Sequence, residues 1–384
     1  MQKKTIAFFT TSRAEFGQII SLILKIKEQS DLDYMLFVGG THLAPEYGQT
    51  IKEIESYDIK VTDTFDFLLN SSDEKSLTIS TGLATQELAS IFSNYNFDFA
   101  LLLGDRFEML SVVTAIILFR KPLIHISGGE VSEGALDNQV RHMITKSAHI
   151  HFAACEEYAD NIRNMGEENW RVFNHGALAI DALVETPLIL KPDLFKDLDL
   201  DPSKETVMLT YHPVTLSNME VKTQISNLFK ALESFNFQVV VTAPNMDIDR
   251  DEIYNLVKGK TLSNPNYRFF DSLGTLRYTS LIPHCKLVVG NSSSGMVQVP
   301  FFKVPTINVG DRQKGRLKHD SVVDTTNDVE DIVSGIQKAI APEFIKGTLN
   351  CKFKYGSGNV AIKMIDTIRS IKVNEELLQK KLSF

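Results

Sequence analysis

The chain has 384 residues, more than a single domain usually contains, and this length predicts two domains. Its composition, 43% hydrophobic and 23% charged, is ordinary for a globular protein with a substantial core. The formal net charge of −8 argues against nucleic acid or an anionic membrane surface as the partner, because either would need a basic face, but it leaves room for a local basic pocket.

The first half of the chain alternates short apolar runs, typical of strands, with longer helical patterns. The expected elements of this half are strands at 6–10, 34–38, 99–103, 123–126 and 150–154 and helices at 19–28 and 109–119. Strands that are apolar throughout and separated by helices are typical of a parallel sheet covered on both faces. Glycine or polar residues follow most of these strands directly, and open α/β sheets bind their ligands beyond the carboxyl ends of the strands.

The same alternation restarts after residues 188–201, which we interpret as a linker with a surface helix. The expected elements of the second half are strands at 207–211, 238–242, 286–290 and 306–310, a helix at 224–235 and a helical pattern at 360–378. The sequence therefore predicts an α/β protein of two Rossmann-like domains with parallel sheets, facing a cleft that holds the active site. We place the N-terminal domain at 1–178, with a C-terminal helix at 365–384 that packs back on it, and the second domain at 179–364.

The cysteines and the N-terminal residues indicate the cellular compartment of the protein. The three cysteines are widely spaced and form neither a zinc-type pair nor a disulfide framework, which fits a reducing compartment. The N-terminus shows no signal-peptide pattern, and the longest apolar run, at 111–119, is too short to span a bilayer. We expect a cytoplasmic protein that has no membrane partner.

Charged residues follow several of the expected N-terminal strands. Arg13 lies in the first strand-to-helix turn, where main-chain N–H groups and a guanidinium attract phosphate; a capped helix with a solvent-facing Arg13 explains the turn equally well. Asp105 and Arg106 come directly after the third strand. Glu130 follows the next strand, and Asp137 comes soon afterwards. A single Asp at such a place more often caps a helix, but several carboxylates around one crevice separate their pKa values, so that one serves as base and another as acid.

Four histidines raise the question of a zinc site: His125, His142, His149 and His151. His149 and His151 alternate on an expected strand, and His125 lies within another, where a core histidine with bonded ring nitrogens is usual. Neither a Cys pair nor an H-x-x-x-H motif accompanies them, so we expect no metal.

The second half supplies groups suited to a phosphorylated ligand. His212 follows the first strand of this half and is a candidate general acid or base, or a partner of phosphate. The segment G-N-S-S-S-G places Ser292, Ser293 and Ser294 at a strand-to-helix turn, where hydroxyl and main-chain N–H groups can cradle a diphosphate. A simple helix cap would need one of these serines. Arg312, in the segment G-D-R-Q-K-G-R, adds a cation beside a strand end in an acidic protein.

Eight segments of the chain resemble the motifs of the hydrolysing UDP-N-acetylglucosamine 2-epimerases, which make N-acetylmannosamine for sialic acid and related nonulosonic acids. In chain order these segments are S-R-A-E-F-G, G-D-R-F-E, G-G-E-V-S-E-G, D-N-Q-V-R-H, Y-H-P-V-T, A-P-N-M-D, G-N-S-S-S-G and G-D-R-Q-K-G-R. They cover roughly residues 5 to 325, and the last two are the most specific. The resemblance implies the two-domain fold shared with GT-B glycosyltransferases, UDP held mainly by the C-terminal domain, and no metal or redox cofactor. We also expect a homo-oligomer, a dimer or a tetramer.

The resemblance also assigns roles to individual residues. It implies catalytic acids at Asp105, Glu130 and Asp137 and a catalytic histidine at His212. It implies nucleotide contacts at Arg13, Arg106, Asn245, Ser292, Ser293 and Arg312. At Gln298 the family usually has a Glu that binds the ribose hydroxyls; the amide still accepts and donates hydrogen bonds, with weaker acceptor strength.

The activity implied by the resemblance is hydrolysis of UDP-GlcNAc to N-acetylmannosamine and UDP, by elimination of UDP and hydration of the resulting glycal. The alternative substrate is UDP-N,N′-diacetylbacillosamine, on the route to legionaminic acid, which differs at C4 and C6 of the sugar. Competing interpretations are a GT-B glycosyltransferase, a non-hydrolysing epimerase and a catalytically silent sugar-nucleotide sensor. The acidic cluster favours elimination over glycosyl transfer, and a silent sensor would be expected to lack those acids.

Overall fold

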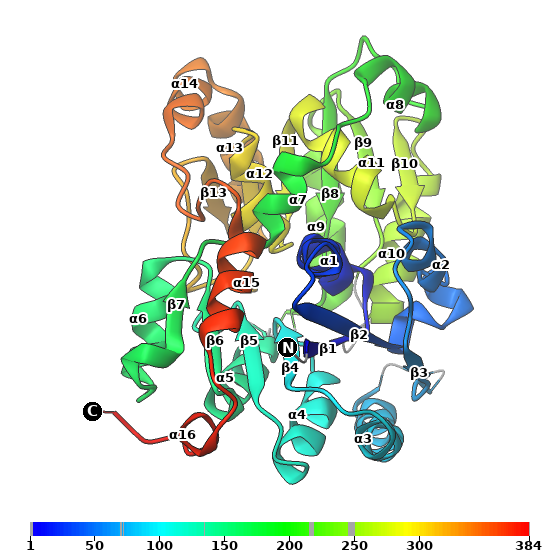
Figure 1. Cartoon of the computed structure of the whole chain (residues 1–384). Coiled ribbons are helices and arrows are strands. Elements are labelled where there is room, and N and C mark those ends of the chain that lie inside the picture. The colour runs from blue at the N-terminus through cyan, green and yellow to red at the C-terminus, as the bar shows by residue number, and fades with distance from the viewer. Residues whose placement is uncertain are drawn as a thin grey trace. The chain divides into compact units, whose positions relative to one another are not determined.

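The structure is a computed structural model that describes residues 3–69, 71, 73–133, 135–214, 219–244 and 250–383 (Figure 1). The described chain divides into two compact units. Unit 1 comprises Met1–Glu130, Asp137–Glu185 and Tyr355–Phe384, and unit 2 comprises Val131–Leu136 and Thr186–Lys354. Each unit is built on its own sheet.

Among the described residues of unit 1, seven strands form one parallel sheet in the order β3-β2-β1-β4-β5-β6-β7. The strands are β1 Lys4–Thr10, β2 Leu32–Gly39, β3 Asp63–Phe65, β4 Phe99–Leu103, β5 Leu123–Ile126, β6 Ile150–Ala153 and β7 Val172–Asn174. The helices of this unit are α1 Arg13–Lys27, α2 Ile51–Ser56, α3 Glu74–Asn94, α4 Met109–Leu118, α5 Asp137–Ser147, α6 Glu156–Asn164, α7 Ala179–Glu185, α15 Val360–Ser370 and α16 Glu375–Leu378.

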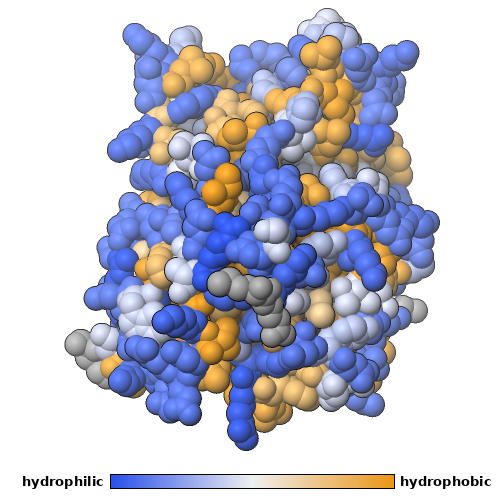
Figure 2. Space-filling model, viewed as in Figure 1, coloured by the Kyte–Doolittle hydropathy of each residue, from blue (hydrophilic) through white to orange (hydrophobic). Residues whose placement is uncertain are grey.

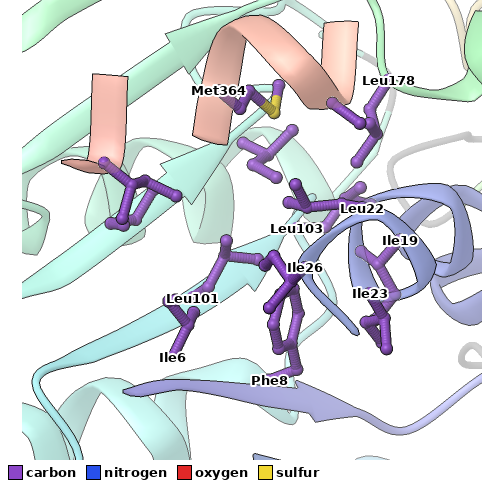
Figure 3. Packing of buried hydrophobic residues seen from close by; sticks show 14 of the residues in the cluster. Ile6, Phe8, Ile19, Leu22, Ile23, Ile26, Leu101, Leu103, Leu178 and Met364 are labelled. Atoms are coloured by element: carbon purple, nitrogen blue, oxygen red, sulfur yellow. The ribbon is translucent and has the colours of Figure 1, made fainter. Parts of the chain in front are cut away.

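Helices cover both faces of this sheet because alternate side chains of a strand point to opposite faces. Ile6 and Phe8 of β1 belong to a core cluster that includes α1 and α15, whereas Ala7 and Phe9 belong to a second cluster that includes α3, α4 and α5. Figure 3 shows the first cluster, in which Met364 of α15 joins apolar residues of α1 at helical spacing: Ile19, Leu22, Ile23 and Ile26. The end of the chain is therefore part of the core around its first strand.

Both ends of α15 are held by residues distant in sequence. The Asp181 carboxylate accepts the main-chain N–H groups of Val360 (2.9 Å) and Ala361 (2.6 Å) at the start of the helix. The Lys4 ammonium donates at 2.7–3.1 Å to main-chain carbonyls at its end, those of Ile368, Arg369 and Ile371. An acid at the N-terminus and a cation at the C-terminus satisfy open main-chain groups and complement the helix dipole.

In the part of unit 2 that the structure describes, six strands form a second parallel sheet in the order β10-β9-β8-β11-β12-β13. The strands are β8 Thr206–Thr210, β9 Gln238–Thr242, β10 Tyr267–Phe270, β11 Cys285–Gly290, β12 Thr306–Val309 and β13 Val322–Thr325. The helices are α8 Lys191–Asp197, α9 Val221–Glu233, α10 Arg250–Leu262, α11 Gly274–Leu281, α12 Ser294–Phe301, α13 Val329–Ile340 and α14 Pro342–Asn350. The predicted fold class, two α/β domains with parallel sheets, is confirmed.

One face of the molecule carries mixed polarity. On the face drawn in Figure 2, hydrophilic and hydrophobic residues are interspersed, as is usual for a folded protein surface. Across the described residues, no helix combines the length and the apolar character needed to cross a membrane.

Candidate active site

The strand order of unit 1 reverses between β1 and β4, which are neighbours in the sheet although two strands separate them in the chain. In doubly wound sheets, ligands bind beyond the carboxyl ends of the strands at such a reversal. Arg13 opens α1 just after β1, and Asp105 follows β4 by way of Gly104, whose φ of +84° favours glycine. Two predicted site residues therefore flank the reversal.

Arg141 of α5 joins the segments that carry the predicted acids. Its side chain is 1% exposed, and its guanidinium forms an ion pair with the Asp105 carboxylate and donates through Nη1 to the main-chain carbonyl of Glu130 (2.9 Å). Asp137 is the first residue of α5, and one helical turn separates it from Arg141. Asp105, Glu130 and Asp137 thus belong to three segments gathered around one buried cation. The charge of the Asp105 carboxylate is compensated by this cation.

A second buried charge pair lies in the same strand-end segment. Arg106 is 9% exposed and donates to Glu108 from Nη2 (2.9 Å) and Nε (3.2 Å). Glu15 of α1 lies nearby: burial raises its pKa to about 7, the Glu108 carboxylate acts in the same direction, and Arg106 acts against it. One oxygen of Glu15 accepts from the main-chain N–H groups of Thr11 (2.9 Å) and Ser12 (3.0 Å), which fixes the turn before Arg13. The nucleotide contact assigned to Arg106 stays a prediction.

Of the four histidines of the zinc hypothesis, three form hydrogen bonds within the part of the protein that the structure describes. His125 lies 2.8 Å from the Gly104 carbonyl and 3.1 Å from the Thr145 hydroxyl, and burial lowers its pKa to about 3. His151 bonds to Glu167 (3.1 Å), and the His149 ring accepts the main-chain N–H of Leu123 (3.1 Å). Burial also lowers the pKa of His142. Within the described residues, no group of three or more His, Cys, Asp or Glu side chains is arranged to hold a metal ion.

The sheet of unit 2 reverses its order between β8 and β11, and His212 and Asn291 follow these two strands. His212 is buried, with its main-chain N–H donated to Asn291 Oδ1 (2.7 Å) and its carbonyl accepting from Asn291 Nδ2 (2.9 Å). Gly290 permits this arrangement, because a Cβ there would lie 1.9 Å from the Thr210 carbonyl oxygen. His212 therefore lies at the ligand-binding edge of its sheet.

The serine segment after β11 opens α12 at this edge. Ser292 and Ser293 are partly or largely exposed, and Ser294, the first residue of α12, is buried. The Ser294 hydroxyl has no hydrogen-bond partner among the described residues. Gln298 lies one turn further along α12 and is half-buried. The main-chain N–H groups of Gly295 and Met296 are bonded to the carbonyls of Ser292 and Ser293, so the serine hydroxyls are the groups of this turn that can bind an anion.

The three cations of the segment after β12 have different environments. Arg312 is 7% exposed, and its Nη1 donates to the main-chain carbonyl of Asn291 (3.3 Å). Lys314 is exposed and lies 3.7 Å from Glu133, and Arg316 donates to Gln313 Oε1 (3.0 Å). Arg312 therefore lies beside the serine segment, whereas Lys314 reaches solvent. Asn245, a predicted nucleotide contact, lies outside the described residues.

Sequence reasoning did not single out Arg141 or Asn291, although both lie in segments that it used. A signal for Arg141 existed: an Arg four residues after an acid on a helix shares a face with that acid. No comparable signal marked Asn291, since its partner His212 lies 79 residues earlier.

Two doubly wound sheets with charged and polar side chains at both strand-order reversals define an α/β protein of the ligand-binding class. The family model described as UDP-N-acetylglucosamine 2-epimerase matches residues 24–369. The chain belongs to the UDP-N-acetylglucosamine 2-epimerase family, as the resemblance predicted, and is an enzyme of that family.

Individual relatives agree with this assignment. The chain is 37% identical to the GDP/UDP-N,N′-diacetylbacillosamine 2-epimerase (hydrolyzing) of Campylobacter jejuni, over 90% of this chain and 89% of the relative. It is 32% identical to the polysialic acid biosynthesis protein P7 of Escherichia coli, over 95% of this chain and 94% of the relative. The crystal structure of UDP-GlcNAc 2-epimerase from Neisseria meningitidis bound to UDP-GlcNAc has the same fold, with a TM-score of 0.82 at 16% identity, covering 96% of this chain and 100% of that one.

Proposed function

We propose that the chain is a hydrolysing 2-epimerase of a UDP-linked 2-acetamido sugar, which releases UDP and the free 2-epimer. The observation that carries this proposal is the arrangement around Arg141, whose guanidinium binds the Asp105 carboxylate and the Glu130 carbonyl from the helix that Asp137 begins. Epimerisation at C2 requires removal of one proton and addition of another, and a set of carboxylates is suited to that task. Family membership supports the same reaction class.

The reaction proceeds in two steps. A carboxylate removes the C2 proton while the bond between C1 and the UDP oxygen breaks, so the C2–H electron pair becomes the C1=C2 double bond of a glycal. Water then adds its oxygen to C1 and gives up a proton to a carboxylate, while a carboxylic acid delivers a proton to C2 on the opposite face. We assign the acid and base roles to Asp105, Glu130 and Asp137 as a set.

Unit 2 supplies the groups for the nucleotide. Ser292, Ser293 and Ser294 bind the diphosphate together with Arg312, whose guanidinium stabilises the negative charge that develops as UDP departs. His212 acts where the sugar joins the diphosphate. Gln298, one turn into α12, binds the ribose hydroxyls.

The proposal also concerns the identity of the sugar that is linked to UDP. The name of the Campylobacter relative, a GDP/UDP-N,N′-diacetylbacillosamine 2-epimerase at 37% identity, favours N,N′-diacetylbacillosamine as the sugar. The family description and the Neisseria structure bound to UDP-GlcNAc favour UDP-GlcNAc. The chain is 37% identical to the Campylobacter relative and 16% identical to the protein of the Neisseria structure. We therefore propose the diacetylbacillosamine derivative as the preferred substrate and UDP-GlcNAc as the second candidate.

Turnover of the two UDP-sugars side by side in D₂O tests the proposal. We expect free UDP and free sugar without an added acceptor, deuterium at C2 of the sugar, and a higher kcat/KM for the diacetylbacillosamine derivative. A sugar that remains attached to UDP would identify a non-hydrolysing epimerase, and a requirement for an acceptor would identify a glycosyltransferase. Free sugar without deuterium at C2 would indicate plain hydrolysis.

A further inference from the structure

Asn291 is the first residue after β11, and it is completely buried. Its main-chain N–H donates to the Thr210 carbonyl (3.2 Å), which continues the pairing of β11 with β8 beyond Gly290. The two chains therefore leave the sheet side by side, and the Asn291 side chain lies next to the peptide groups of His212.

The Asn291 amide binds His212 through both of its polar atoms. Oδ1 accepts the His212 main-chain N–H at 2.7 Å, and Nδ2 donates to the His212 carbonyl at 2.9 Å. A carboxamide can do this because it carries an acceptor and a donor on one planar group, whereas a carboxylate can only accept. His212 is itself buried, so an unmet peptide group at this point would be costly.

The main-chain carbonyl of Asn291 faces two further residues. It accepts from Arg312 Nη1 (3.3 Å) and from Gln313 Nε2 (2.9 Å). Asn291, which directly precedes the serine segment, thus connects the histidine segment, 79 residues earlier, with the arginine segment.

We propose that Asn291 is a positioning residue: its carboxamide fixes the main chain of His212 and, through it, the direction of the imidazole relative to Arg312. Asn291 itself need not touch the substrate. The role rests on the proposed function, because it matters for catalysis where His212 acts on the sugar–diphosphate junction. Position 291 therefore requires a side chain of the length of Asn that carries one acceptor and one donor.

The same unit contains a matched control. Gln238 is buried, accepts the main-chain N–H of Asp201 through Oε1 (2.9 Å), and donates to the Asp201 carbonyl through Nε2 (2.7 Å). It makes the same pair of bonds as Asn291, but it begins β9, at the opposite edge of the sheet from His212. Loss of its donor tests fold stability without touching the candidate site.

The experiment compares Asn291→Asp with Gln238→Glu, each alone and combined with His212→Ala, in the full chain. Each variant replaces the amide donor by a carboxylate oxygen, so both should lower the Tm. We expect Asn291→Asp to reduce kcat by ~10²-fold, the scale of a misplaced catalytic group, and to alter the pH profile of kcat. Gln238→Glu should leave kcat and its pH profile unchanged. In the His212→Ala background, adding Asn291→Asp should lower kcat by less than about a further threefold. The effects of substitutions in residues that act as a unit are not additive.

UDP binding separates this role from a general loss of the nucleotide site. Since the Asn291 carbonyl remains in the variant, we expect the Kd of UDP to change by less than about fivefold, well below the loss of kcat. If Asn291→Asp does not fold, the same measurements are made on Asn291→Ser. Equal kcat in Asn291→Asp and Gln238→Glu, or full additivity with His212→Ala, would overturn the positioning role. Absence of turnover by the wild-type chain with either UDP-sugar would instead refute the proposed function.

Discussion

The guanidinium of Arg141 forms an ion pair with the carboxylate of Asp105, which lies 36 residues earlier in the chain. Arg141 is 1% exposed and the Asp105 side chain 26% exposed, so a buried cation holds a carboxylate that stays partly accessible. An Arg fork can bind a carboxylate and a carbonyl at once in a fixed geometry, which a Lys ammonium on a flexible stem cannot reproduce.

Arg141→Lys should therefore lower turnover by ~10²-fold, because a small displacement of a catalytic group is enough for a loss of that size. UDP affinity should stay within about threefold, since the groups assigned to the nucleotide in unit 2 are untouched. Arg163→Lys is the control, because Arg163 pairs with Glu156 and Asp160 at the surface and its exchange should alter neither quantity. Normal turnover by Arg141→Lys would remove the organising role of Arg141.

The three acids can be tested by amide substitution. Asp105→Asn, Glu130→Gln and Asp137→Asn keep the shape of each side chain but remove its titratable proton. We expect each variant to bind UDP and to lose turnover by ~10²-fold or more, the usual scale for lost acid–base catalysis. Steady-state rates beside UDP titrations measure both effects. A variant with wild-type turnover would take its residue out of the acid–base set.

Arg312 and Lys314 provide a matched pair for the diphosphate. Arg312 is buried beside Asn291, whereas Lys314 is exposed and lies near Glu133. UDP should raise the Tm of the wild-type chain as its concentration increases, because a ligand that binds the folded state stabilises it. Arg312→Ala should weaken UDP binding by ~10–10²-fold, the cost of one charge-assisted hydrogen bond, whereas Lys314→Ala should not. Equal UDP affinity in both variants would contradict the assignment.

Glu167 gives the structure a defined response to acid. Burial alone would raise the pKa of Glu167, but hydrogen bonds from His151, Lys146 and Lys380 lower it to about 2. Because this folded-state pKa lies below the ordinary value of 4.5, the stabilisation is complete above pH 4.5 and is lost as the pH falls toward 2. Glu167→Gln should lower the Tm at neutral pH and flatten the decline of Tm between pH 5 and pH 3, measured at constant ionic strength. Glu156→Gln should flatten that decline much less, because the pKa of Glu156 is lowered by the Arg163 hydrogen bond in an exposed pair that solvent screens.

The central strands of both sheets could be predicted from the sequence, but the edge strands could not. Strands such as β4 and β9 are buried along their whole length and read as continuous apolar runs. The described strands at the sheet edges, β3, β7, β10 and β13, are short and only partly buried, so their sequences lack such a run and none of them was predicted. Edge strands gain their structure from pairing with a neighbour, which a local pattern does not record.

The candidate site also has features that could be predicted from the sequence and features that could not. That Asp105 and His212 would follow strands could be predicted, because a buried apolar run ending in a polar residue is a local pattern. That Arg141 would bind Asp105, or Asn291 His212, depends on which strands become neighbours, and the strand order is a property of the whole sheet. The sequence therefore identified the segments of the site more completely than the bonds that connect them.

The position of α15 in the core of unit 1 has a consequence for synthesis on the ribosome. Ile6 and Phe8 emerge before unit 2 is made, but Met364, which lies in the same cluster, emerges only after residues Thr186–Lys354 of unit 2 (Figure 3). Until then the apolar face formed by β1 and α1 is incompletely covered, and the Asp181 carboxylate and the Lys4 ammonium still lack the helix ends they hold. The N-terminal sheet is therefore a nascent intermediate with exposed apolar surface, the kind of species that chaperones bind. The core of unit 1 can close only after unit 2 has been synthesised, because Thr186–Lys354 precede α15 in the chain.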